Sequence, residues 1–278
     1  MLKKQKKIAV INDFSGFGRC SLTVSLPIIS AMKIECCALP TAVFSNHTAY
    51  SDYYFDDYTD KMQFYYSKWQ KLGLEFDGIY TGFLGSVQQI QIVTDFINNF
   101  SNKNTTVIID PVMGDNGCTY ATYNNELCRR MKDLVPLADI ITPNITEACI
   151  LSDTPYSENI SDEKSLLEIS QKLHSTGCKN IIITGINDGK NICNFVYENS
   201  GKYCLLKNNN AGQQRAGTGD VFASIIAADA VNGTDLITSV KKAADFVSSA
   251  MILSDQMNIP VQEGVCFEEI LGKLIYNS

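Results

Sequence analysis

Several residue types that build metal centres and anion-binding surfaces are scarce in this chain of 278 residues. It has two histidines, and its ten cysteines include no C-x-x-C pair, so the ligand spacing of a zinc site is missing. The formal net charge is -7, so we expect no broad positive field for nucleic acid or an anionic membrane. The chain has four arginines, which are Arg19, Arg129, Arg130 and Arg215.

Long apolar runs are also missing. The apolar run behind the basic start covers only residues 8–11, which is too short for a signal peptide. No stretch approaches the roughly 20 apolar residues of a membrane span. We therefore expect a globular cytoplasmic protein with reduced cysteines, and neither nucleic acid nor a membrane as its partner.

Short β-branched runs alternate with amphipathic segments along the whole chain. Apolar runs such as residues 107–109 and 181–183 are typical of strands in a parallel sheet that is covered on both faces. The last two runs predict a hairpin, and thus an antiparallel edge. No linker or repeat interrupts the pattern, so we expect one α/β domain over residues 1–278. The predicted strands cover residues 8–11, 36–44, 78–82, 106–110, 139–142, 180–184, 192–197 and 202–207, and the predicted helices 21–32, 57–72, 87–99, 124–134, 162–175, 220–231, 234–253 and 267–275.

Short polar residues follow the predicted strands. Ligands of open α/β sheets bind beyond the carboxyl ends of the strands, so these segments should share one rim. Each segment taken alone is also ordinary turn chemistry. They are residues 12–18, 44–48, 110–115, 142–147 and 184–185.

The most informative segment is Gly217-Thr218-Gly219-Asp220, at the start of a predicted helix. Backbone amides there can converge on an anion, and Asp220 could accept a proton from an attacking hydroxyl. The alternative is that Asp220 only caps the helix and the glycines only form a turn. We expect the helix N-terminus to lower the pKa of Asp220, which phosphoryl transfer tolerates.

Three carboxylates on the same rim, Asp110, Asp115 and Glu147, could hold magnesium, which uses few direct protein ligands. The alternatives are a strand-end turn at Asp110 and a first-turn helix charge at Glu147.

Two further side chains have two interpretations each. Arg215 either pairs with the β- or γ-phosphate of a nucleotide or is a solvent-facing loop residue. His47 is either a substrate contact or a buried histidine.

Together these motifs resemble the ribokinase-like superfamily. They are Asp110-Pro111-Val112-Met113-Gly114, Thr142-Pro143-Asn144 with Glu147, and Gly217-Thr218-Gly219-Asp220. Residues 44–50, 81–86 and 135–141 narrow the resemblance to the pyridoxal (pyridoxine, pyridoxamine) kinase family. It implies a three-layer sandwich in which a mostly parallel central sheet with an antiparallel edge carries helices on both faces.

This resemblance implies an ATP-dependent enzyme that phosphorylates the 5′-hydroxyl of a vitamin B6 vitamer, a small heteroaromatic alcohol. It implies magnesium and a homodimer, and leaves a requirement for a monovalent cation open. The implied catalytic residues are Asp220 as base and Gly217, Thr218 and Gly219 as anion hole. The implied ATP contacts are Asp110, Asn144 and Thr184, to which we add Arg215, and the implied magnesium residues are Asp110, Asp115 and Glu147. The implied pocket for the substrate ring contains Asp13, Ser45, His47, Thr48 and Phe83.

The start of the chain departs from this family. Asp13 stands where many pyridoxal kinases have serine, and residues 13–18 look more like the start of hydroxymethylpyrimidine kinases. A hydroxymethylpyrimidine kinase of thiamin synthesis is therefore the alternative function. A non-catalytic nucleotide or vitamer binder is the third. The chain has no Gly-Gly pair, which argues against a sugar kinase.

Overall fold

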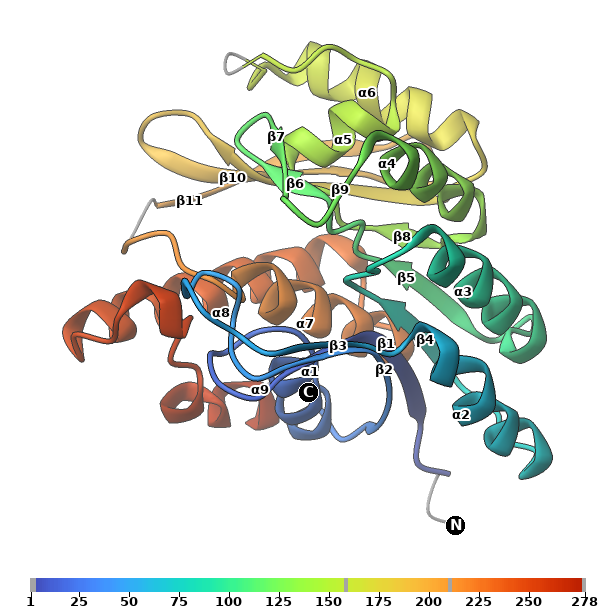
Figure 1. Cartoon of the computed structure of the whole chain (residues 1–278). Helices are drawn as coiled ribbons and strands as arrows, with labels where there is room; N and C mark the ends of the chain where they lie inside the picture. Colours follow the sequence, from blue (N-terminus) through green and yellow to red (C-terminus); the bar gives the residue numbers. More distant parts are fainter. Residues whose placement is uncertain (1–3, 158–159, 210–211, 277–278) are drawn as a thin grey trace.

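The computed structural model describes residues 4–157, 160–209 and 212–276. A central sheet of nine strands has helices on both of its faces (Figure 1). The strand order is β11-β10-β9-β8-β5-β4-β1-β2-β3. The six strands from β9 to β2 in this order are parallel, whereas β10, β11 and β3 join antiparallel. The predicted α/β architecture with an antiparallel edge is confirmed, and β3 adds a second antiparallel edge that was not predicted.

The elements have the following bounds. The strands are β1 Lys7–Ser15, β2 Glu35–Phe44, β3 Phe55–Asp57, β4 Gly78–Thr81, β5 Thr106–Ile109, β6 Gly114–Asp115, β7 Cys118–Thr119, β8 Ile140–Ile141, β9 Asn180–Asn187, β10 Asn191–Tyr197 and β11 Tyr203–Asn209. The helices are α1 Ser21–Ala31, α2 Thr59–Lys71, α3 Val87–Phe100, α4 Asn125–Met131, α5 Ile145–Leu151, α6 Glu163–Ser175, α7 Thr218–Asn232, α8 Leu236–Gln256 and α9 Gly272–Tyr276.

Each face of the sheet carries its own apolar cluster. Neighbouring strand residues point to opposite faces, so Val10 and Ile108 join one cluster while Ile11 and Ile109 join the other. Helices α2 to α6 cover the face of Ile11, and α1, α7, α8 and α9 cover the face of Val10 (Figure 1). Every strand in the centre is therefore buried on both sides, which explains the continuous apolar runs. Within the described ranges, no helix has the length and apolar character needed to cross a bilayer.

Several elements extend or divide differently from the prediction, among them the helix predicted at residues 267–275, which is a 3-10 helix over Glu268–Ile270 followed by α9. β1 continues to Ser15, because Phe14 and Ser15 pair with β2 beyond a register shift. β9 continues to Asn187 through its antiparallel pairing with β10. The helix predicted at residues 124–134 ends as α-helix at Met131 and continues as a 3-10 helix that contains Pro136. Proline has no backbone N–H to donate in an α-helix, which favours this change.

Candidate functional site

Two glycines, Gly217 and Gly219, lie at the start of α7, and their surroundings differ. Gly217 is the N-cap residue and has a φ of 75°. A Cβ built there would lie 1.9 Å from the Arg19 carbonyl oxygen, so packing alone requires glycine. A Cβ on Gly219 would meet no protein atom within 4 Å. Open space therefore lies beside the backbone at Gly219, next to the amides of the helix N-terminus.

Asp220 is the third residue of α7, not its cap. Gly217 occupies the cap position, and the helix has no side-chain cap hydrogen bond. The interpretation of Asp220 as a mere N-cap is therefore wrong. Its Oδ1 instead accepts a hydrogen bond at 3.2 Å from Nδ2 of Asn12, which lies near the carboxyl end of β1.

The pKa of Asp220 moves opposite to our expectation. Burial raises it from 3.8 to about 6, and the negative charge of Asp13 adds to the increase. Hydrogen bonds from the Ser21 backbone amide and the Asn12 side chain lower it without cancelling the effect of burial. The expectation that the helix N-terminus leaves a lowered pKa is wrong, because desolvation of the carboxylate outweighs it. A carboxylate of this kind is a better proton acceptor than an exposed aspartate.

Two further buried carboxylates extend this charge, because Asp110 lies close enough to Asp220, and Glu147 to Asp110, for their charges to interact. Burial raises the pKa of Asp110 to about 7, with a contribution from the charge of Asp220. Burial also raises the pKa of Glu147, to which Asp110 contributes. Thr142 Oγ1 donates to Asp110 at 3.0 Å. The site therefore concentrates negative charge, and a cation bound there would stabilise the ionised forms.

The fit to a magnesium ion can be tested on these carboxylates. No cluster of three or more His, Cys, Asp or Glu within metal-binding distance occurs among the residues that the structure describes. Glu147 Oε1 and Oε2 already accept from the backbone amides of Met113 and Asn144. Asp115 Oδ2 accepts from Gln214 Nε2 at 2.9 Å. The residues fit an ion held mainly through water and phosphate oxygens, as magnesium commonly is.

Asn144 and Glu147 form a capping box at the start of α5. Asn144 Oδ1 accepts from the Glu147 amide at 3.0 Å, and Asn144 Nδ2 donates to the Gly114 carbonyl oxygen at 2.7 Å. The side chain thus ties α5 to the β6–β7 hairpin. The first-turn interpretation of Glu147 is confirmed. Thr184 lies within β9, not after it, and its amide donates to the Pro143 carbonyl oxygen at 2.8 Å.

Arg215 is buried and paired. Its Nη2 donates to Asp255 Oδ1 at 2.6 Å and its Nη1 to the Ile259 carbonyl oxygen at 2.7 Å. The interpretation as a solvent-facing loop arginine is wrong, because only 7% of the residue is exposed. A contact with a phosphate would require this ion pair to open. Arg215 therefore fastens the segment before Gly217 to the end of α8.

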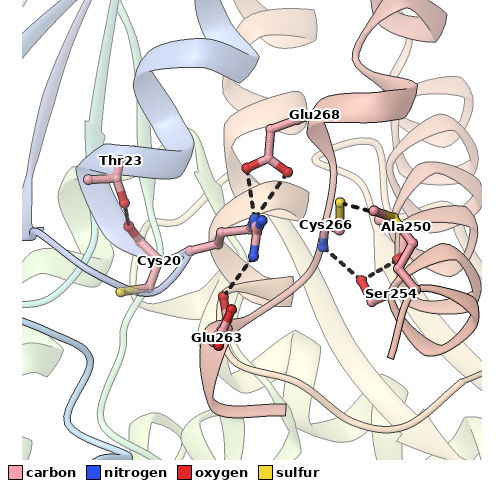
Figure 2. A network of polar contacts seen from close by, with 9 residues as sticks. Cys20, Thr23, Ala250, Ser254, Glu263, Cys266 and Glu268 are labelled. Atoms are coloured by element: carbon pink, nitrogen blue, oxygen red, sulfur yellow. Dashed lines mark hydrogen bonds and ion pairs between the residues drawn. The ribbon is translucent and has the colours of Figure 1, made fainter. Parts of the chain in front are cut away.

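A second arginine, Arg19, links the turn at Gly217 to the C-terminal segment of the chain. Arg19 Nε donates to Glu268 Oε1 at 2.7 Å, and its Nη1 donates to the Glu263 carbonyl oxygen at 3.3 Å. Figure 2 shows both glutamates beside the network in which the Cys266 amide donates to Ser254 Oγ. The Arg19 carbonyl oxygen lies against Gly217, so the C-terminal segment braces the turn before α7.

The residues of the expected ring pocket lie on segments at or just beyond the ends of β1, β2 and β4. The His47 amide donates to the Phe17 carbonyl oxygen, and the Phe83 ring packs edge-on against Phe44 at 6.1 Å. Ser45 and Thr48 are exposed. His47 is half-buried, and burial lowers its pKa, so it is not the fully buried histidine of the second interpretation, and a substrate contact stays a prediction.

Asp13 differs from its neighbours in the expected ring pocket. It is buried, and its oxygens accept from Ser21 Oγ at 2.5 Å and Ser15 Oγ at 3.0 Å. Its desolvated carboxyl has a raised pKa. A direct ring contact by Asp13 would compete with these two hydrogen bonds. Its charge does reach Asp220, whose pKa it raises.

Sequence reasoning missed two residues of the site. Asn12 was read only as part of a polar loop, although it contacts Asp220. Tyr120 follows β7, and burial together with Glu147, Asp115 and other site carboxylates raises its pKa, which places its hydroxyl near them. The ring remains 45% exposed. No sequence pattern indicated Tyr120, because the two-residue strands β6 and β7 have no periodicity to read.

Comparisons with known proteins identify the family and the fold of the chain. The phosphomethylpyrimidine kinase family model matches residues 29–265. A Bacteroides thetaiotaomicron protein that is provisionally named a phosphomethylpyrimidine kinase and was solved with pyridoxal is 38% identical, with a TM-score of 0.94 over 98% of this chain and 96% of that one. The pyridoxal kinase of Lactobacillus plantarum is 26% identical, with a TM-score of 0.90 over 98% and 97% of the two chains.

A sequence relative is the hydroxymethylpyrimidine/phosphomethylpyrimidine kinase of Haemophilus influenzae, 31% identical over 64% of this chain. The match spans 65% of that relative's length. The match of the family model to most of the chain, together with these folds, decides the family. The chain belongs to the phosphomethylpyrimidine kinase family and has the ribokinase-like fold.

Proposed function

We propose that this chain is an ATP-dependent kinase that phosphorylates the 5′-hydroxyl of a vitamin B6 vitamer, namely pyridoxal, pyridoxine or pyridoxamine. The observation that carries the proposal is the buried carboxylate of Asp220 beside the glycine-flanked start of α7. In this proposal the segment that contains His47 and the ring of Phe83, which packs against Phe44, contact the ring of the alcohol. The relative solved with pyridoxal supports this substrate class.

The proposed reaction is an in-line transfer of the γ-phosphoryl group. The alcohol oxygen forms a bond to phosphorus while the bond to the ADP oxygen breaks, and Asp220 receives the proton of the alcohol. The backbone at Gly217, Thr218 and Gly219 faces the transferred group, and the N-terminus of α7 adds favourable potential. In this proposal Asp110, Asn144 and Thr184 contact ATP, while Arg215 holds the segment before Gly217 through its ion pair with Asp255.

Magnesium would be held by Asp110, Asp115 and Glu147, largely through water. The ion would neutralise charge that develops between the β- and γ-phosphates. Arg215, which directly precedes the segment from Ala216 to Gly219, is already paired with Asp255 and so does not supply this positive charge. We therefore expect turnover to disappear with excess EDTA and to return when magnesium is added. Turnover that persists in EDTA would contradict the magnesium proposal.

The second candidate is a hydroxymethylpyrimidine kinase of thiamin synthesis, which the family model and the H. influenzae relative favour. The two functions differ in the ring that the pocket accepts. Measuring ADP release with pyridoxal, pyridoxine, pyridoxamine and hydroxymethylpyrimidine separates them. The B6 proposal fails if no vitamer is turned over, and the pyrimidine proposal gains if the aminopyrimidine alcohol has the highest kcat/KM.

The third candidate, a binder without catalysis, is tested at Asp220. Asp220→Asn keeps the shape of the side chain but removes the proton acceptor. We expect kcat to fall by roughly 10²-fold or more while ATP still binds. An Asn variant with wild-type turnover would show that Asp220 is not the base.

We further propose that the protein is a cytoplasmic homodimer. A requirement for a monovalent cation is tested by comparing turnover in potassium and sodium salts.

A further inference from the structure

Asn12, near the end of β1, makes hydrogen bonds in two directions. Its Oδ1 accepts from the backbone amides of Asp13 and Phe83, both at 2.9 Å. Backbone amides only donate, so the side-chain oxygen must face them. Its Nδ2 must then face Asp220 Oδ1, at 3.2 Å. The orientation of this amide follows from the chemistry of its partners.

The surroundings of Asn12 hold the side chain in this orientation. Asn12 is 1% exposed. A Cβ on Gly82 would lie 2.4 Å from Asn12 Nδ2 and 2.7 Å from its Oδ1, so glycine at this position leaves the room that the amide occupies. Asn12 therefore has little freedom to rotate away from Asp220.

Asn12 differs from the charged and polar groups around Asp220. The charge of Asp13 raises the pKa of Asp220, and Asp220 raises that of Asp110, Cys20 and Tyr80 in turn. Among the described residues, Asn12 is the side chain that donates a hydrogen bond to Asp220. It therefore orients this carboxylate without adding charge.

We propose that Asn12 is a positioning residue that holds Asp220 toward the reacting alcohol and ties it to the ring pocket through the Phe83 backbone. The inference rests on the proposed function, because it assigns Asn12 to the base of that reaction. Misplacement of a reacting group by about 1 Å can cost roughly 10²-fold in rate. The contacts of Asn12 lie within the protein, so its loss should affect kcat more than the binding of either substrate.

The test uses Asn12→Asp, which has the same shape. Its oxygen can still accept from Asp13 and Phe83, but its ionised form cannot donate to Asp220 and adds a negative charge beside it. Asn12→Ala, which removes the donor without adding charge, is therefore measured as well. We expect kcat to fall about 10-fold or more, with KM for ATP and for the alcohol within about 3-fold of wild type. ATP affinity by calorimetry should be unchanged. Asn180→Asp is the matched control, because Asn180 also bonds in both directions but lies at the other end of the sheet.

The outcomes separate the two proposals. Wild-type kcat in Asn12→Asp, or a lower melting temperature without a change in kcat, would overturn the positioning role. Asn12→Ala is judged by the same criterion of lower kcat at near-normal KM, also where Asn12→Asp does not fold. An active wild type with an unaffected Asn12 variant contradicts this inference alone. A wild type inactive on every alcohol contradicts the proposed function and this inference with it.

Discussion

At the scale of single residues, the site combines backbone that packing constrains with carboxylates that burial makes more basic. Gly217 is fixed by its positive φ and by the Arg19 carbonyl oxygen, whereas Gly219 has no protein neighbour that would clash with a side chain. Glycine inside the first turn of a helix is otherwise unfavourable relative to alanine. Gly219 therefore gives up helix stability where a ligand must approach the backbone closely.

This difference gives a matched pair of variants. Gly219→Ala should leave the protein as stable as wild type or more stable, by about 0.5–1 kcal/mol. Its kcat should fall about 10²-fold, because the methyl group occupies the space of the transferred group. Gly217→Ala should instead lower the melting temperature. Thermal unfolding and steady-state kinetics of both variants check this prediction. Full activity in Gly219→Ala would show that Gly219 is not part of the anion hole.

The raised pKa of Asp220 gives a pH prediction. The base must be ionised, so kcat/KM should rise as the pH rises through about 6 and level off above it. Removing the negative charge of Asp13 should lower the pKa of Asp220, so Asp13→Asn should move this limb to lower pH. The pH profile of both proteins is measured with the binding of ATP followed separately. A limb that stays in place in Asp13→Asn belongs to another group.

At the scale of elements, α5 and the β6–β7 hairpin depend on each other. Asn144 caps the helix with its oxygen and holds the hairpin at Gly114 with its nitrogen, and the Gly117 amide donates to Thr146 Oγ1. The hairpin also reaches the loop before α7, where Gln214 contacts Asp115. One short helix thus positions two of the segments that surround the carboxylates.

Two substitutions of Asn144 separate its functions. Asn144→Asp keeps a good N-cap but cannot donate to the Gly114 carbonyl oxygen, which its carboxylate would repel, so we expect a small loss of stability and a several-fold rise in KM for ATP. Asn144→Ala loses the cap as well and should lose about 1 kcal/mol of unfolding free energy. Denaturant unfolding and ATP kinetics provide the measurements. Equal ATP kinetics in wild type and Asn144→Asp would exclude a role for the tie to the hairpin.

The longer elements were predicted closely, whereas β3, β6 and β7 were not predicted and β8 is shorter than the strand predicted at residues 139–142. β2 and α3 begin and end within a residue of their predicted bounds, because their apolar pattern fills the interface between sheet and helices. β3, β6 and β7 have two or three residues each, and β8 has only two. Such segments are strands because of the partner beside them, and this partner is set by the tertiary fold.

At the scale of the whole molecule, the β3 edge and its aromatic side chains are open to solvent. Tyr54 is 66% exposed and Phe55 is 45% exposed. An edge strand with exposed apolar side chains favours association, and the expected homodimer would cover it. We expect a dimer in solution that Tyr54→Lys converts to a monomer. Leu72→Lys, an equally exposed position at the end of α2, should leave the dimer intact.

Sedimentation velocity over a range of concentrations checks this prediction. A wild type that stays monomeric at every concentration would exclude the dimer. A dimer that persists in Tyr54→Lys would place the interface on another surface. Kinetics of the monomeric variant then show whether substrate binding depends on the partner, because Phe44, which contacts Phe83 of the expected ring pocket, also packs against Phe55 of this edge.

The sequence by itself determined the layered fold and most of the rim. Parallel strands that are buried on both faces must be continuously apolar, and their carboxyl ends must carry the polar chemistry, so Asp110, Glu147 and Asp220 could be read from the chain. Only the tertiary structure decided the partners of these groups. Arg215 was expected near phosphate but pairs with Asp255, and Asn12 reaches Asp220, 208 residues away. Burial depends on everything packed around a group, so the raised pKa of Asp220 has no local signal in the sequence.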